Sequence, residues 1–139
     1  MKKIKKKQNA FTLIEVLVVA TILGVLLSIA IVSFSRAQKK ARDARRKADL
    51  EIVRQGLILY RQDNGSYGNI GSDNAGFNSL VTTLFNDEYL TSTTVLDPVN
   101  DSNYFYSLTC SAADNPNCSK VRLSATLETD ASTYEISTP

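Results

Sequence analysis

The chain has 139 residues, with 16 Lys and Arg against 14 Asp and Glu, two Cys, no Trp and no His. This length allows one modest domain rather than a multidomain enzyme. Without His, the Ser-His and Cys-His pairs of nucleophilic catalysis are excluded, and so is a zinc site with His ligands. The composition therefore argues against an enzyme, and it indicates neither a cofactor nor a metal centre.

The nearly balanced total hides a strong charge asymmetry along the chain. Five Lys and no acid lie before Phe11, and the 24 residues from there to Phe34 contain one ionisable group, Glu15. Residues 36–61 carry nine basic and three acidic side chains, whereas residues 62–139 carry two basic and ten acidic ones. The chain therefore has a net positive charge up to residue 61 and a net negative charge after it.

The apolar segment 11–34 predicts a membrane span. As a helix, 24 residues extend over about 36 Å, which exceeds a bilayer core of about 30 Å. A secretory signal has an apolar core of only about 7 to 15 residues before a small-x-small cleavage site. Ser28-Ile29-Ala30 imitates such a site, but apolar residues continue beyond it. The acid-free Lys cluster places the N-terminus in the cytoplasm and exports the residues after the span.

Glu15 is the exception in this apolar segment. A carboxylate within a membrane span is unfavourable, and it usually marks a functional position with an identifiable partner. The segment itself contains no Lys or Arg. Either Glu15 lies passively among the headgroups of a simple single-pass anchor, or its partner comes from elsewhere.

The residues around Glu15 resemble a known family. Residues 10–19, Ala-Phe-Thr-Leu-Ile-Glu-Val-Leu-Val-Val, follow a Lys-rich leader, and they resemble the N-terminal region of type IV pilins and type II secretion pseudopilins. The resemblance implies that a prepilin peptidase cleaves between Ala10 and Phe11 and N-methylates Phe11. It also implies that Glu15 supports assembly by facing the amino terminus of a neighbouring subunit. The family nearly always has Gly before the cleaved bond, where this chain has Ala10.

Residues 35–61 contain no Pro and predict a continuation of the helix. Small and apolar residues recur there at helical intervals: Ala37, Ala41, Ala44, Ala48, Ile52 and Leu59, widened by Leu50, Val53, Leu57 and Tyr60. One helix of about 50 residues follows from this pattern. Its alanines would permit close approach of neighbouring helices.

The same segment contains a cluster of basic residues, namely Arg36, Lys39, Lys40, Arg42, Arg45, Arg46 and Lys47. We interpret the cluster as a solvated or headgroup-facing surface of the helix. The acidic heads of other subunits are an alternative partner, and DNA is a weaker one.

The remaining residues predict a small head. Asp63-Asn64-Gly65 ends the helix, within a stretch that resembles the Tyr-x-x-Asp-Asn-Gly-x-Tyr-Pro junction of pseudopilins, with Gly68 at the Pro position. A polar loop to about Asn78 and a short helix over 79–89 are expected next. The three predicted strands cover 104–108, 121–127 and 133–136, the last at an edge.

The predicted fold is α+β, with a long N-terminal transmembrane helix that continues into a small globular head. A sheet of three or four antiparallel strands packs on the helix, because neither a short hairpin nor an exposed helix is stable alone. The expected segments are a leader (1–10), a hydrophobic assembly helix (11–34), its amphipathic continuation (35–62) and the α+β head (63–139).

Cys110 and Cys118 enclose a turn-rich spacer, and an exported compartment favours a disulfide over two thiols. The loop resembles the C-terminal disulfide loop of type IV pilins, whereas secretion pseudopilins usually hold this region with calcium. Asp97, Asp101 and Asp114 supply oxygen donors, but no ordered calcium loop is visible. These acids are interpreted as turn residues.

The sequence therefore predicts a structural subunit of a type IV pilus-like or type II secretion-like filament. The implied partners are prepilin peptidase, other copies and other pilins, an assembly ATPase, a platform protein and the membrane. The implied location is the bacterial inner membrane, with the fibre in the periplasm or on the cell surface. A single-pass membrane-anchored binding module and a DNA-uptake pilin of competence filaments are the alternatives.

Overall fold

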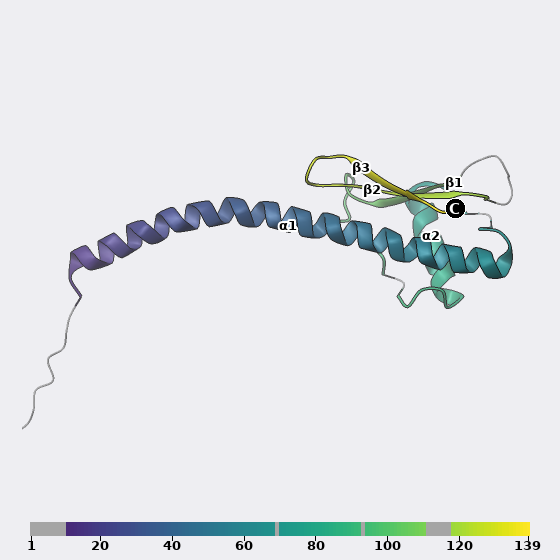
Figure 1. Cartoon of the computed structure of the whole chain (residues 1–139), viewed down its shortest axis with the longest axis horizontal. Coiled ribbons are helices and arrows are strands. Elements are labelled where there is room, and N and C mark those ends of the chain that lie inside the picture. The colour runs from purple at the N-terminus through teal and green to yellow at the C-terminus, as the bar shows by residue number, and fades with distance from the viewer. Residues whose placement is uncertain (1–10, 69, 93, 111–117) are drawn as a thin grey trace, which may run out of the picture. The chain divides into compact units, whose positions relative to one another are not determined.

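The computed structural model describes residues 11–68, 70–92, 94–110 and 118–139. Within them, the elements are α1 (Leu13–Asn64), α2 (Asp73–Asn86), β1 (Tyr106–Cys110), β2 (Val121–Thr126) and β3 (Thr133–Ser137) (Figure 1). The predicted α+β fold, with a long N-terminal helix and a small antiparallel sheet, is confirmed. The chain divides into two compact units, one up to Ala37 and one from Gln38 onward, and α1 contributes to both.

α1 ends where the sequence predicts, at the Asp-Asn-Gly turn. Gly65 adopts a φ of 77°, and its N–H donates to the Arg61 carbonyl at 2.7 Å, which closes the last turn. Gly68 has a φ of 72°. Pro cannot adopt this angle, because its ring fixes φ near −65°. The backbone at Gly68 thus differs from that of a junction with Pro at this position.

The sheet has the order β1-β2-β3, and both pairings are antiparallel. Val121, Leu123 and Ala125 of β2 are buried, while Arg122 between them is exposed. This alternation is the pattern that predicted the strand. β3 lies at an edge, as expected, and β1 ends at Cys110, two residues later than predicted.

α2 begins earlier than the sequence suggests. The predicted helix covered 79–89, and residues up to Asn78 were expected to form a loop, yet α2 already starts at Asp73. Its start is specified by β1: Asp73 forms an isolated bridge with Leu108, and the Asn74 side-chain amide donates to the Tyr106 carbonyl at 2.9 Å. Such a contact between distant segments is not visible in a local pattern.

The hydrophobic core of the head lies between the C-terminal half of α1, α2 and the inner face of the sheet (Figure 1). α1 contributes Leu50, Val53 and Leu57, which are fully buried. The predicted stripe of small and apolar residues on α1 therefore does not form one buried face. Its leucines and valine are buried in the core, whereas Ala41, Ala44 and Ala48 are exposed. Between Ala37 and Leu50 the buried face is polar, and it carries Asp43 and Arg46.

Candidate functional site

α1 begins with a reciprocal cap formed by Thr12 and Glu15. The Thr12 N–H and hydroxyl both donate to Glu15 Oε2 at 2.9 Å, and the Glu15 N–H donates to Thr12 Oγ1 at 3.3 Å. This arrangement is a capping box, which satisfies N–H groups that a helix start leaves unpaired. A carboxylate has about four acceptor positions, so the cap does not exhaust the capacity of Glu15.

Sequence reasoning singled out Glu15 but missed Thr12. The signal was present, because Thr-x-x-Glu before an apolar run is the sequence pattern of a capping box. Phe11, the predicted methylation site, is exposed directly before this cap. Ala10, on the other side of the predicted cleavage site, lies outside the described residues.

The helix that follows presents its apolar side chains to the outside. Between Phe11 and Phe34, every large hydrophobic residue whose side chain the structure describes is exposed. α1 is long and apolar enough, by length and composition, to cross a membrane. A surface of this kind requires lipid or other apolar helices as its environment.

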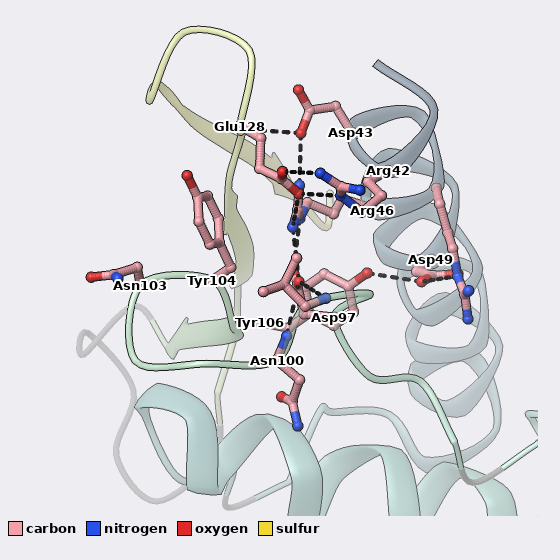
Figure 2. Close-up of polar contacts among 12 residues, drawn as sticks. Arg42, Asp43, Arg46, Asp49, Asp97, Asn100, Asn103, Tyr104, Tyr106 and Glu128 are labelled. Atoms are coloured by element: carbon pink, nitrogen blue, oxygen red, sulfur yellow. Dashed lines mark hydrogen bonds and ion pairs between the residues drawn. The ribbon is translucent and has the colours of Figure 1, made fainter. Parts of the chain in front are cut away.

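In the head, the fully buried Arg46 is held by three carboxylates (Figure 2). Its guanidinium donates to Asp97 at 2.6 and 2.9 Å and to Asp43 at 2.8 Å, and it lies 2.8 Å from Glu128 Oε1. Arg42 forms a second two-point ion pair with Glu128. We call these five residues the Arg46 cluster.

The Arg46 cluster joins three segments of the head, namely α1, the turn at Asp97 and the turn between β2 and β3. Asp43 accepts the N–H groups of Glu128 and Thr129 at 2.8 and 3.0 Å, which fixes the β2–β3 turn on α1. Beside the cluster, the Tyr106 hydroxyl donates to Asp49 Oδ2 at 2.8 Å, which links β1 to the same helix (Figure 2). The cluster therefore determines how the sheet is seated on the helix.

The hydrogen bonds of the cluster keep its groups ionised. Burial acts to raise the pKa of Asp97, but the guanidinium of Arg46 and the N–H groups of Val99 and Asn100 outweigh it, so this pKa lies below its usual range. The bonds from Arg42 lower the pKa of Glu128, and the bond to Asp97 raises the pKa of Arg46. A buried charge of this kind is stable only while its partners remain.

This geometry corrects two interpretations made from the sequence. Arg46 is not part of a solvated basic surface, because it is buried and paired with Asp97, and the half-buried Arg42 is paired with Glu128. Asp97 is not simply a turn acid, because it is the main partner of Arg46. Asp101 does serve its own turn, where it accepts the N–H groups of Asn103 and Tyr104.

Cys110, at the end of β1, and Cys118, before β2, form a disulfide with a Cα–Cα distance of 5.8 Å. Their spacer, which includes Asp114, lies outside the described residues. Among the residues described, no group of three or more His, Cys, Asp or Glu side chains is arranged to hold a metal ion.

Comparisons with known proteins agree with these features. Residues 5–31 match the family model described as the prokaryotic N-terminal methylation motif. Type II secretion system core protein G of Vibrio cholerae serotype O1 is 35% identical over 88 residues, which are 63% of this chain and 58% of that protein. Its namesake in Escherichia coli strain K12 is 35% identical over 75 residues, or 54% of this chain and 50% of that protein.

The chain spans about half the length of the curated relatives it matches, and no solved structure matches it. An apolar helix that is long enough to cross a membrane, starts at a capped glutamate and leads into a small α+β head agrees with the prepilin-like subunit predicted from the sequence. The methylation motif and the homology to core protein G confirm the family predicted from the sequence, the type IV pilins and pseudopilins. This is a family of structural subunits rather than enzymes.

Proposed function

We propose that the chain is a pseudopilin-type subunit that is processed, methylated and polymerised into a filament. In this proposal residues 1–10 are a leader, and prepilin peptidase removes them between Ala10 and Phe11 and methylates Phe11. Residues 11–34 then pack against other subunits, residues 35–62 extend the helix, and residues 63–139 form the displayed head. The similarity to type II secretion core protein G favours a secretion pseudopilus over a surface pilus.

The observation that carries the proposal is the position of Glu15 in the first turn of an exposed apolar helix, which begins directly after Phe11 and Thr12. Cleavage before Phe11 would create an amino group that is cationic below a pKa of about 8. The capped carboxylate still has acceptor positions. The amino terminus of a neighbouring subunit would therefore supply the positive partner that the apolar segment itself lacks.

Pairing of Glu15 with a neighbour would specify register rather than drive association. Lipid tails are as apolar as the helix surface, so apolar packing alone does not draw the helix out of a membrane. We therefore assign extraction to an assembly ATPase and a platform protein. Before processing, the Lys-rich leader lies in the cytoplasm, and the head lies on the opposite side of the inner membrane.

The test compares the N-termini of the chain in membranes and in sheared filaments. Edman sequencing and mass spectrometry should find methyl-Phe11 in the filaments. An intact Met1 that is confined to the membrane would instead favour a permanently anchored binding module and would contradict the proposal.

The Glu15→Leu variant tests the assembly role separately. It should insert into membranes and be processed, but it should form no filaments. Glu15→Gln, which keeps the side-chain shape and removes the charge, is the matched control for the importance of the ion pair. Normal filaments from both variants would contradict the assigned role of Glu15.

A further inference from the structure

Exposed basic side chains gather where α1 enters the head. They are Lys39, Lys40, Arg45 and Lys47, and we call them the basic end. In the part of the chain that the structure describes, only Arg45 among them has a carboxylate partner, a contact of 3.6 Å with Asp49. Lys47 lies over the Tyr134 ring, 5.2 Å from its centre. The adjoining Arg46 cluster has three carboxylates and two guanidinium groups, so it offsets one positive charge, and the basic end keeps a net positive charge through Lys39, Lys40 and Lys47.

Exposed acidic side chains gather where α1 leaves the head. Asp63 lies in the last turn of α1, and Asp87 and Glu88 directly follow α2; these three form the acidic end. Tyr89 joins the two segments, because its hydroxyl donates to Asp63 Oδ2 at 2.9 Å. The described residues contain no Lys or Arg that forms an ion pair with any of the three.

The helix termini strengthen this polarity. α1 ends at Asn64 and α2 ends at Asn86, so the carbonyl ends of both helices lie at the acidic end. Each helix C-terminus carries about half a negative charge. Along α1, Lys40 and Asp63 are about 35 Å apart at 1.5 Å per residue. This separation is several times the Debye length of about 8 Å at physiological salt, so the two ends do not neutralise each other within one copy.

We propose that the acidic end of one copy docks on the basic end of another copy that is displaced along the filament by about 35 Å. The Glu15 pair joins a nearer neighbour, because residues 11 and 15 are only about 6 Å apart along the helix. This inference rests on the proposed filament. Every copy in one membrane has the same orientation, because each has its apolar segment before its head. At equal height, parallel neighbours place like charges side by side, whereas a shift of about 35 Å brings opposite charges together.

The contact joins two different surfaces of the same chain. Such an interface repeats from copy to copy and produces an open polymer rather than a closed dimer. The exposed face of α1 between the two ends suits close approach, because Ala44 and Ala48 are small and Ile52 is 51% exposed. The partner is therefore a second copy of this chain, displaced along the helix axis by about 35 Å.

Charge reversal with rescue in the full chain tests this contact. One variant carries Lys39→Glu and Lys40→Glu, a second carries Asp87→Lys and Glu88→Lys, and a third combines all four changes. Each double variant should reduce the yield of sheared filaments by about tenfold, and the combined variant should restore it, because its ends are again complementary. The matched control is Lys120→Glu with Arg122→Glu, the same charge change as in the first variant, at exposed positions directly before and within β2; it should assemble normally.

Cross-linking provides a measurement without charge reversal. A chain with Lys40→Cys and Glu88→Cys should form disulfide-linked ladders in filaments but not in membranes. Normal yields from both double variants, no recovery in the combined variant, or an absence of ladders would each overturn the inference while the proposed function stands. A wild-type chain that forms no filaments with methyl-Phe11 would overturn both.

Discussion

Arg46 and Asp97 form a two-point ion pair between positions that are 51 residues apart in the sequence. The Nε–Oδ2 and Nη2–Oδ1 distances are 2.6 and 2.9 Å, and both side chains are fully buried. Asp97 Oδ1 also accepts the N–H groups of Val99 and Asn100. One carboxylate therefore organises its own turn and attaches that turn to α1.

Replacement of Arg46 by Met should strongly destabilise the head. Met preserves much of the side-chain volume but leaves Asp43, Asp97 and Glu128 without their shared cation. Removal of one partner from a buried ion pair reduces the free energy of unfolding by about 3 to 5 kcal/mol. Urea unfolding of the full chain in detergent, followed by the near-UV signal of tyrosine, measures this loss.

Arg45→Met is the control, because Arg45 is exposed and forms only a 3.6 Å contact with Asp49. An exposed pair of this kind contributes about 0 to 1 kcal/mol. Equal stability of Arg45→Met and Arg46→Met would mean that the Arg46 cluster does not hold the head together.

The stability of the head should fall in acid. The pKa values of Asp43, Asp97 and Glu128 are lowered in the folded chain; for Asp97, burial opposes the shift, but the bonds from Arg46 and from backbone N–H groups outweigh it. The unfolded chain, with pKa values of about 3.9 for Asp and 4.3 for Glu, therefore binds protons first as the pH falls. This contribution is complete above about pH 5 and is lost progressively below that pH.

Urea unfolding at a series of pH values measures this dependence. Asp97→Asn removes one of the three groups, so the free energy of unfolding should vary less steeply with pH below about 5 than in the wild-type chain. The same steepness in both chains would show that Asp97 does not contribute to the acid sensitivity.

The parts of the fold that depend on local patterns were predictable from the sequence. The absence of Pro and the Asp-Asn-Gly turn placed the end of α1, and the alternation of Val121, Leu123 and Ala125 placed β2. The start of α2 was not predictable, because it depends on contacts between Asp73 and Leu108 that only the folded chain creates.

The candidate site was also predictable only where a local pattern marks it. Glu15 stands out because it is charged within an apolar run. The burial of Arg46 does not, because basic residues on a helix normally face solvent and its main partner is distant in the sequence. Helical periodicity detects where apolar side chains recur, and it gives no signal for a buried face that is charged.

Substitution of Gly68 should reveal the unusual backbone at the α1 junction. Its φ of 72° is strained for residues with a Cβ, so Gly68→Ala should lower the free energy of unfolding by about 1 kcal/mol. Gly68→Pro should lower it by about 3 kcal/mol or more, because the ring cannot adopt this φ. Thermal and urea unfolding measure both changes.

Gly68→Asn is the matched control, since Asn tolerates the left-handed region better than Ala does. The expected order of stability is Gly68, then Asn, then Ala and finally Pro. A Pro variant as stable as the wild-type chain would mean that residue 68 adopts the extended conformation of a Pro junction instead.

Replacement of Thr12 by Val should weaken assembly without preventing membrane insertion. Val keeps the shape of Thr but removes the hydroxyl that donates to Glu15 Oε2 and accepts the Glu15 N–H. The carboxylate is then less firmly oriented at the helix start, so filament yield should fall by about fivefold, the effect of losing a typical cap. Thr12→Ser retains the hydroxyl and should assemble nearly as well as the wild-type chain. Quantification of sheared filaments against membrane-bound chain checks both variants, and equal yields from Val and Ser would contradict a role for the cap.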